Sequence, residues 1–253
     1  MSRRVRALSR VRFGVVLAAA VALGAVAREA GAAAEVHRLN LVISAIPTQV
    51  QATDFNRDLD QFNRIYLEPG GLEGIKKITF AWYYDVQLRY FVRQNVAVCA
   101  GAGQLRSATK REFLPAIDQD VQLRAEILSV PVQVGGAYYF QPYNQGDFQA
   151  RAYLGGGLMS LVYNRERFGI NTTFVGGSFQ RSGRGDSPGF YVETGAHMFF
   201  AARFSAMVGA IYRNAKIRDL EGRVRSPAGI FRVPVPDLDT SGVGARMALA
   251  IGF

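Results

Sequence analysis

The sequence contains few of the side chains that bind metals or carry out nucleophilic catalysis. It has two histidines, His37 and His197, and a single cysteine, Cys99. One cysteine excludes an intramolecular disulfide scaffold and a multi-cysteine metal site, and two histidines leave little room for a histidine-rich metal centre. No recognisable nucleophile motif stands beside either histidine. We therefore expect no catalytic residue, no metal and no cofactor.

Charged residues at alternating positions offer a different chemistry. If they face an enclosed interior they must pair, because an unpaired buried charge is expensive. They would then form either a salt-bridge network that fills the interior or a charged constriction in a narrow pore. The candidates for this polar network are Asp85, Arg89, Arg151, Glu193, Arg213 and Arg246.

The elements that must position these charges have a period of two. In Lys77–Val92 every even position is apolar, whereas the odd positions, which include Asp85 and Arg89, are largely polar. Successive side chains of a strand point to opposite faces, so this segment predicts a strand with one apolar face. The closing segment, 240–253, repeats the pattern.

Read in this way, the chain after residue 34 contains eight strands. Their connections alternate between short turns and long links, and the long links cover 47–76, 108–120, 165–187 and 218–239. The apolar positions change phase near Glu126–Leu128, which predicts a β-bulge there. The strands are expected at 36–46, 77–92, 95–107, 121–140, 147–164, 188–201, 203–217 and 240–253.

The placement of aromatic residues separates a membrane barrel from a soluble periplasmic β-sandwich. Aromatics on the apolar face lie at its two ends, and ten residues separate Phe80 from Tyr90. Ten tilted residues rise about 25 Å, the height of the apolar band of an outer-membrane barrel. The opposite face is rich in Gly and Ala, as a narrow bore requires. The expected aromatic girdles are Phe80, Trp82, Tyr90, Tyr138, Phe140, Phe148, Phe190, Phe200, Phe204 and Tyr212.

Residues 1–34 are expected to form a cleaved signal peptide. Five arginines in residues 1–12 precede an apolar run, Phe13–Ala27, and small-residue sites such as Ala32-Ala33-Ala34 follow. The run is shorter than the roughly 20 residues of a spanning helix. Removing this segment takes six Arg and one Glu from the 30 basic and 20 acidic residues, and lowers the net charge from +10 to +5. No basic block interleaved with aromatics remains, so we expect no nucleic-acid partner.

The pattern of residues 35–253 resembles the small outer-membrane barrels of the OmpA/OmpW-like superfamily. The most specific element is the last strand, whose alternating apolar residues end in Phe253; the segments Phe80-Ala81-Trp82, Pro131–Val134 and Tyr138-Tyr139-Phe140 also look family-like. The resemblance implies an all-β fold: an eight-stranded antiparallel up-and-down transmembrane β-barrel in a Gram-negative outer membrane. It also implies that the barrel-assembly machinery reads Phe253 as a membrane-assembly signal.

For function, we expect a non-catalytic barrel with a structural or surface-interaction role, in contact with outer-membrane lipids. The alternative is a narrow OmpW-like channel for small or hydrophobic solutes. Some eight-stranded barrels are lipid A acyltransferases or deacylases, but His37 and His197 fall at the short-turn end, away from the outer rim where such chemistry occurs. In the first long loop, 47–76, Phe55, Leu59 and Phe62 recur at helical spacing. A short amphipathic helix is expected there, either packed over the barrel mouth or acting as a lid or contact for a solute or surface partner.

Overall fold

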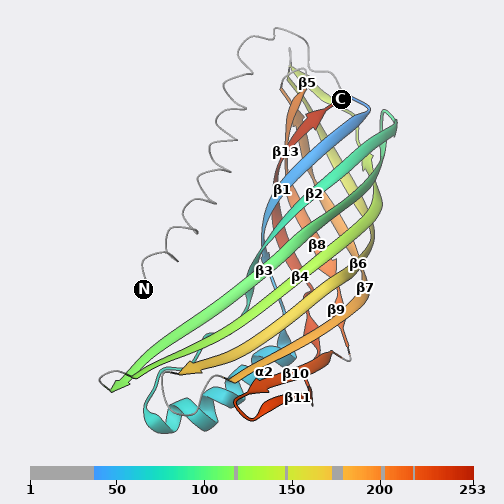
Figure 1. Ribbon diagram of the computed structural model, residues 1–253. Coiled ribbons are helices and arrows are strands. Elements are labelled where there is room, and N and C mark those ends of the chain that lie inside the picture. Colours follow the sequence, from blue (N-terminus) through green and yellow to red (C-terminus); the bar gives the residue numbers. More distant parts are fainter. Residues whose placement is uncertain (1–36, 117–118, 146–147, 173–178, 201–202, 219) are drawn as a thin grey trace.

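The computed structural model describes residues 37–116, 119–145, 148–172, 179–200, 203–218 and 220–253. The expected signal peptide lies outside these residues. Within them, eight long strands pair antiparallel in one closed ring, because β13 pairs with β1 (Figure 1). The predicted eight-stranded barrel is therefore confirmed. Its strands are β1 (Leu39–Gln49), β2 (Phe80–Arg93), β3 (Val96–Ala116), β4 (Gln119–Tyr139), β6 (Phe148–Thr172), β7 (Phe179–Phe199), β8 (Phe204–Asn214) and β13 (Gly242–Gly252).

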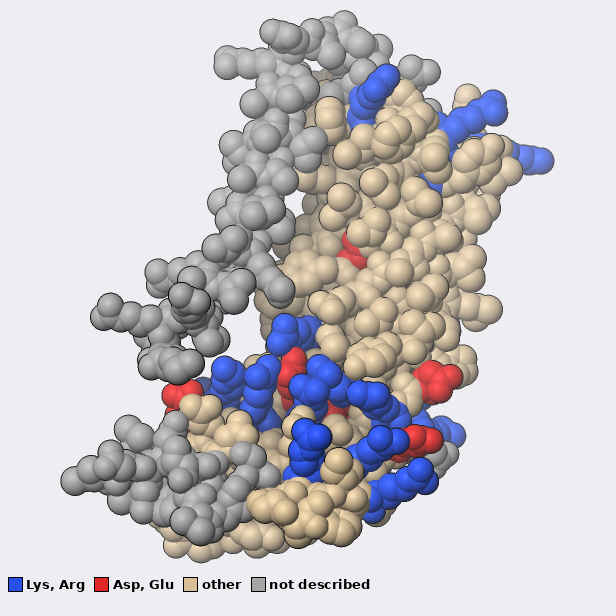
Figure 2. Space-filling view, viewed as in Figure 1, with Lys and Arg blue, Asp and Glu red and all other residues tan. Residues whose placement is uncertain are grey.

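The two faces of each strand differ as the alternation predicts. On β2, Val86 and Leu88 are each 48% exposed, whereas Gln87 between them is fully buried in the bore. Figure 2 shows the result, a wide surface almost free of charge between two charged ends. Among the described residues, no helix is both long and apolar enough to cross a membrane.

Four strands are longer than expected. The links 108–120 and 165–187 were predicted to be loops, and this is wrong for most of their length, because β3, β4, β6 and β7 continue through much of both segments. In the link 218–239, β10 (Glu221–Ser226) and β11 (Gly229–Pro234) form a hairpin that pairs with β7. Shorter pieces are β5 (Tyr143–Gln145), β9 (Lys216–Ile217) and β12 (Leu238–Asp239).

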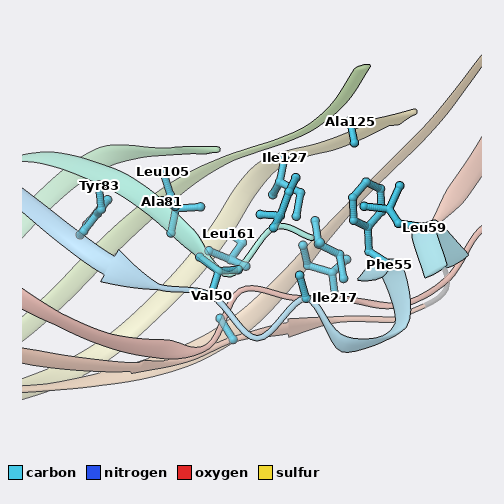
Figure 3. Close-up of a cluster of buried hydrophobic side chains, with 14 of the residues drawn as sticks. Val50, Phe55, Leu59, Ala81, Tyr83, Leu105, Ala125, Ile127, Leu161 and Ile217 are labelled. Carbon is cyan, nitrogen blue, oxygen red and sulfur yellow. The ribbon is translucent and has the colours of Figure 1, made fainter. Parts of the chain in front are cut away.

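A helix in the first long link explains these extensions. Helix α2 (Thr53–Phe62) runs into a π-helical turn, η2 (Asn63–Leu67), and a short 3-10 turn, η3 (Glu68–Gly70). Phe55 and Leu59 are buried against the inward face of the extended strands, among Ile127, Leu161 and Ile217 (Figure 3). The strands can continue beyond the membrane band because their inner face packs on this apolar core.

The predicted bulge at Glu126–Leu128 is wrong. Strands β3 and β4 pair without a shift from Ala102–Val132 to Phe113–Val121, whereas β6 carries an extra residue, Val162, opposite Val130 and Pro131 of β4. The change of phase in the sequence has another cause. Odd residues of β4 face inward throughout, but the interior changes from polar in the membrane band to apolar beside α2.

Candidate functional site

The bore of the barrel holds a cluster of four charged side chains. Arg89 on β2 lies 2.6 Å from Glu193 on β7, and Arg246 on β13 lies 2.7 Å from Asp85 on β2. Arg246 also pairs with Glu193. All four side chains are at most 1% exposed. We call these four residues the bore cluster. Because two arginines meet two carboxylates, their formal charges cancel.

Uncharged groups add further hydrogen bonds to the bore cluster, although Oδ1 of Asp85 and Nε of Arg246 have no partner within the described residues. Arg89 donates through Nε to Gln87 at 2.7 Å and through Nη1 to the Tyr139 hydroxyl at 2.9 Å. The Gln133 amide donates to Asp85 at 3.0 Å. Sequence reasoning did not name these three residues as part of the site. The alternation could have identified them, because each occupies a position whose side chain faces the bore.

Arg151 and Arg213 line the bore but do not join the cluster. Arg151 donates to the Gln149 side chain at 3.0 Å and to the Gln94 carbonyl at 2.5 Å, near the short turns. The Arg213 guanidinium lies over the Tyr83 ring, 4.8 Å from its centroid, and donates to Thr48. Each arginine sits too far along the axis from the carboxylates and is held by neutral acceptors instead.

A buried His–Ser pair lies between the bore cluster and the short turns. Nε2 of His197 is 2.7 Å from Oγ of Ser205, and Nδ1 is 3.3 Å from the Tyr139 hydroxyl. His197 is fully buried and Ser205 is 2% exposed. Within the described residues the imidazole has no carboxylate partner, and the pair is enclosed in the bore near the short turns, away from the outer rim. Among the described residues, no three His, Cys, Asp or Glu side chains are grouped to hold a metal.

Helix α2 covers the loop end of the bore, and polar contacts hold the helix to the neighbouring segments. Asn56 bonds both the N–H and the carbonyl of Ile78 at 2.8 Å, so the returning chain is fixed to the helix. Asp58 of α2 pairs with Arg181 of β7 at 2.7 Å, and Glu166 of β6 lies behind this pair. Burial raises the pKa of Glu166 from its ordinary value of 4.5 to about 7.

An apolar pocket of about 670 Å³ opens beside this helix at the loop end. It lies between α2–η2 and the extended strands β4, β6 and β7, and Phe62, Tyr66 and Phe168 are among its walls. Phe62 and Phe168 meet edge to face at 4.8 Å. The pocket is of the size and character that suit a small apolar molecule.

The ten residues expected in the aromatic girdles all lie on the outer face of the barrel or at its rim. Nine are exposed and Phe204 is half-buried. Trp82 and Tyr90 sit at opposite ends of β2, and Trp82 stacks on Tyr84 at 6.0 Å. Phe253 is 64% exposed, and its N–H donates to the Leu39 carbonyl at 2.8 Å.

A scan against protein-family models and a search among curated proteins find no match. Three solved structures are similar in fold. A major outer membrane protein from Thermus thermophilus is 11% identical, with a TM-score of 0.43, and covers 86% of this chain and 100% of that one. The N-terminal β-barrel domain of Pseudomonas aeruginosa OprF is 12% identical, with a TM-score of 0.38 and coverages of 85% and 97%. The outer membrane protease OmpT from Escherichia coli is 9% identical, with a TM-score of 0.34 and coverages of 85% and 96%.

The closed antiparallel ring, the apolar exterior and the side chains that fill the bore define a small outer-membrane β-barrel. A barrel built in this way lies in the outer membrane, because its exterior requires lipid. At these identities the likeness describes the fold alone. Whether this chain is an enzyme rests on its own residues.

Proposed function

We propose that this protein is a non-catalytic outer-membrane barrel with a structural or surface-interaction role carried by its loop end. The bore cluster supports this proposal most directly. Its ion pairs join β2 to β7 and β2 to β13 across the bore, with side chains at most 1% exposed. Together with α2 and its apolar core at the mouth, they fill the bore with packed side chains, which supports a closed barrel over a water-filled porin.

The loop end, in contrast, is extensive and ordered. Extended strands, the β10–β11 hairpin and α2 form one packed layer beyond the membrane band. Loops on a rigid scaffold commonly carry binding function, and a surface partner would meet this layer first.

Planar-bilayer recording of the purified protein tests the role. A barrel closed by the bore cluster should show no discrete conductance steps, and regular steps in the wild-type protein would overturn the proposal. An enzyme would reveal itself differently, as a mass shift in lipid A on expression. We expect the same lipid profile with the wild type, the Ser205→Ala variant and an empty vector.

A second candidate, a narrow conduit for small hydrophobic solutes, is favoured by the apolar pocket beside α2. Uptake of a radiolabelled alkane by expressing cells separates the two roles. A conduit should give uptake that falls several-fold when Phe168→Asp introduces a charge into the pocket wall. Uptake equal to that of the empty vector would leave the structural role standing.

A further inference from the structure

Arginines gather on the outer face of the extended strands, immediately beyond the apolar exterior. Figure 2 shows basic side chains crowded at the loop end, below the uncharged band. The five that we call the basic face are Arg106 on β3, Arg124 on β4, Arg165 and Arg167 on β6, and Arg184 on β7.

The strand register brings these arginines together. Arg165 stands directly opposite Arg184 in the β6–β7 ladder. Arg167 stands opposite Glu126 in the β4–β6 ladder, and Arg184 stands opposite Glu221 in the β7–β10 ladder. Directly opposed side chains have Cβ atoms about 5 Å apart, and like charges so placed destabilise a sheet. A nearby negative charge would therefore stabilise the opposed Arg165–Arg184 pair.

The described part of the chain supplies little of it. Glu126 uses both carboxylate oxygens, for Arg106 at 2.9 Å and Arg124 at 2.7 Å, and its side chain is only 5% exposed. Those two arginines stay 48% and 43% exposed, so they are oriented by the acid and still present N–H groups outward. Of the other acids, Glu112 lies on β3 and Asp186 on β7, and Glu221 of β10 is the cross-strand neighbour of Arg184.

Among the described residues, the remaining arginines make no close ion pair, although Arg167 and Arg184 each have an acidic cross-strand neighbour. Arg165, Arg167 and Arg184 form no ion pair, and the Nε atoms of Arg124, Arg165 and Arg167 are buried without a hydrogen-bond acceptor. Burial, together with the positive charge of Arg165, lowers the pKa of Arg167 below its ordinary value. These are the properties of an anion site whose ligand comes from outside the chain.

The height of the basic face identifies the source of that anion. Arg106 pairs in register with Trp82, a residue of the expected loop-end girdle. On β4 the apolar outer face runs ten residues from Tyr138 to Leu128, a rise of about 25 Å, and Glu126 follows at once. The basic face thus lies where lipid headgroups meet the barrel.

A groove continues the basic face toward β2. It has a volume of about 350 Å³ and is lined by Lys76 and Arg106 together with Phe80 and Trp82. A lining of both cations and exposed aromatics matches a molecule with an anionic head and an apolar body.

We propose that the basic face and this groove bind the phosphate groups of outer-leaflet lipids. Guanidinium groups hold phosphate bidentately, and several acting together give a site that a single surface arginine does not. The proposal is independent of the structural role given above, since it concerns the outer wall and makes no use of the bore.

Native mass spectrometry of the full chain in detergent micelles tests the proposal, with bisphosphorylated lipid A and its dephosphorylated form as probes. We expect the bisphosphorylated form to bind at least about tenfold more tightly. The triple variant Arg124→Gln, Arg165→Gln, Arg167→Gln should lose about tenfold or more of that affinity. Equal affinity for the two lipids, or an unchanged triple variant, would overturn the site.

The matched control removes three charges from the hairpin, through Arg223→Gln, Arg225→Gln and Arg232→Gln, and should change affinity less than about threefold. An equal loss in this control would mean non-specific attraction and would defeat the proposal. If the first triple variant does not fold, the corresponding Arg→Lys variant keeps the charge and should bind several-fold more weakly than the wild type. Displacement of the lipid by millimolar inorganic phosphate, or equally by dextran sulfate, would reject a lipid site in favour of a general anion site.

Discussion

At the scale of single residues, the bore cluster shows how a narrow barrel accommodates charge. Glu193 accepts from both Arg89 and Arg246, which are themselves fully buried. Two arginines therefore depend on one carboxylate. A buried pair adds little stability over an apolar core, but losing one partner leaves an uncompensated charge.

The Glu193→Gln variant should accordingly be destabilised by about 3–5 kcal/mol, because Arg89 loses its carboxylate and Arg246 keeps only Asp85. Urea unfolding of the protein refolded into lipid vesicles measures the change. Glu221→Gln, at an exposed position of β10, is the control and should fall within about 0.5 kcal/mol of the wild type. A loss below about 1 kcal/mol in Glu193→Gln would show that the cluster does not stabilise the bore.

Glu166 makes the loop end sensitive to pH. Because its pKa is raised from 4.5 to about 7 in the folded state, its contribution to stability is complete below pH 4.5. The contribution is then lost as the pH rises through about 7, and is worth at most about 3 kcal/mol. Hydrogen exchange of α2 amides, corrected for intrinsic rates, should show more frequent opening at pH 8 than at pH 5. The Glu166→Gln variant should abolish this dependence, and a wild-type helix equally protected at both values would contradict the assignment.

At the scale of elements, the outer face of the strands could be predicted and their length could not. The alternation on β2 fixed which side chains face lipid, because the lipid demands an unbroken apolar surface. In the described parts of the links 108–120 and 165–187, outward positions are mostly polar, and the inward ones include the apolar residues Phe113, Phe168 and Ile170. In the membrane band the pattern is the reverse, so the sequence predicts loops for these segments. The apolar inward positions are explained only by the packing of Phe55 and Leu59 of α2 in the barrel mouth, a tertiary contact that the sequence pattern does not contain.

The site was predictable to a similar degree. The alternation of side chains along each strand predicts which charged residues face the bore: Asp85, Arg89, Glu193 and Arg246. The position along the barrel axis then decides which of the inward arginines reach a carboxylate. Arg151 and Arg213 share the inward parity and sit at other heights, which no single-strand pattern records.

The Val132→Arg variant tests the assignment of the lipid face. Val132 is an exposed residue of β4 in the middle of the apolar band. An arginine there should cost about 2–4 kcal/mol in lipid vesicles. The control is Ile230→Arg on β11, exposed beyond the band and expected to be near neutral. Equal stability of the two variants would exclude this orientation of β4.

At the scale of the whole molecule, we propose that assembly depends on the end of β13. Its outward residues Val243, Met247 and Leu249 are exposed, and Phe253 follows them at the rim beside Leu39. The alternation and the terminal aromatic are the features that we propose the barrel-assembly machinery reads.

Deleting Phe253 should lower the amount of heat-modifiable barrel in the outer membrane several-fold while the chain is still exported. The fold loses only one hydrogen bond, from the Phe253 N–H to Leu39, so the deleted protein should still refold in detergent. Gel mobility of heated and unheated membrane fractions measures the first effect, and refolding yield measures the second. Normal membrane yield after deletion would remove Phe253 from the role proposed for it.

The pairing of β1 with β13 joins the earliest strand of the chain to the latest. At every intermediate stage of synthesis the sheet has two open edges, each with unsatisfied backbone groups that hydrocarbon cannot tolerate. The barrel can therefore close only after the last strand, β13, has reached the membrane. A nonsense mutation that removes β13 should consequently abolish the barrel completely and leave no partly functional protein in the membrane.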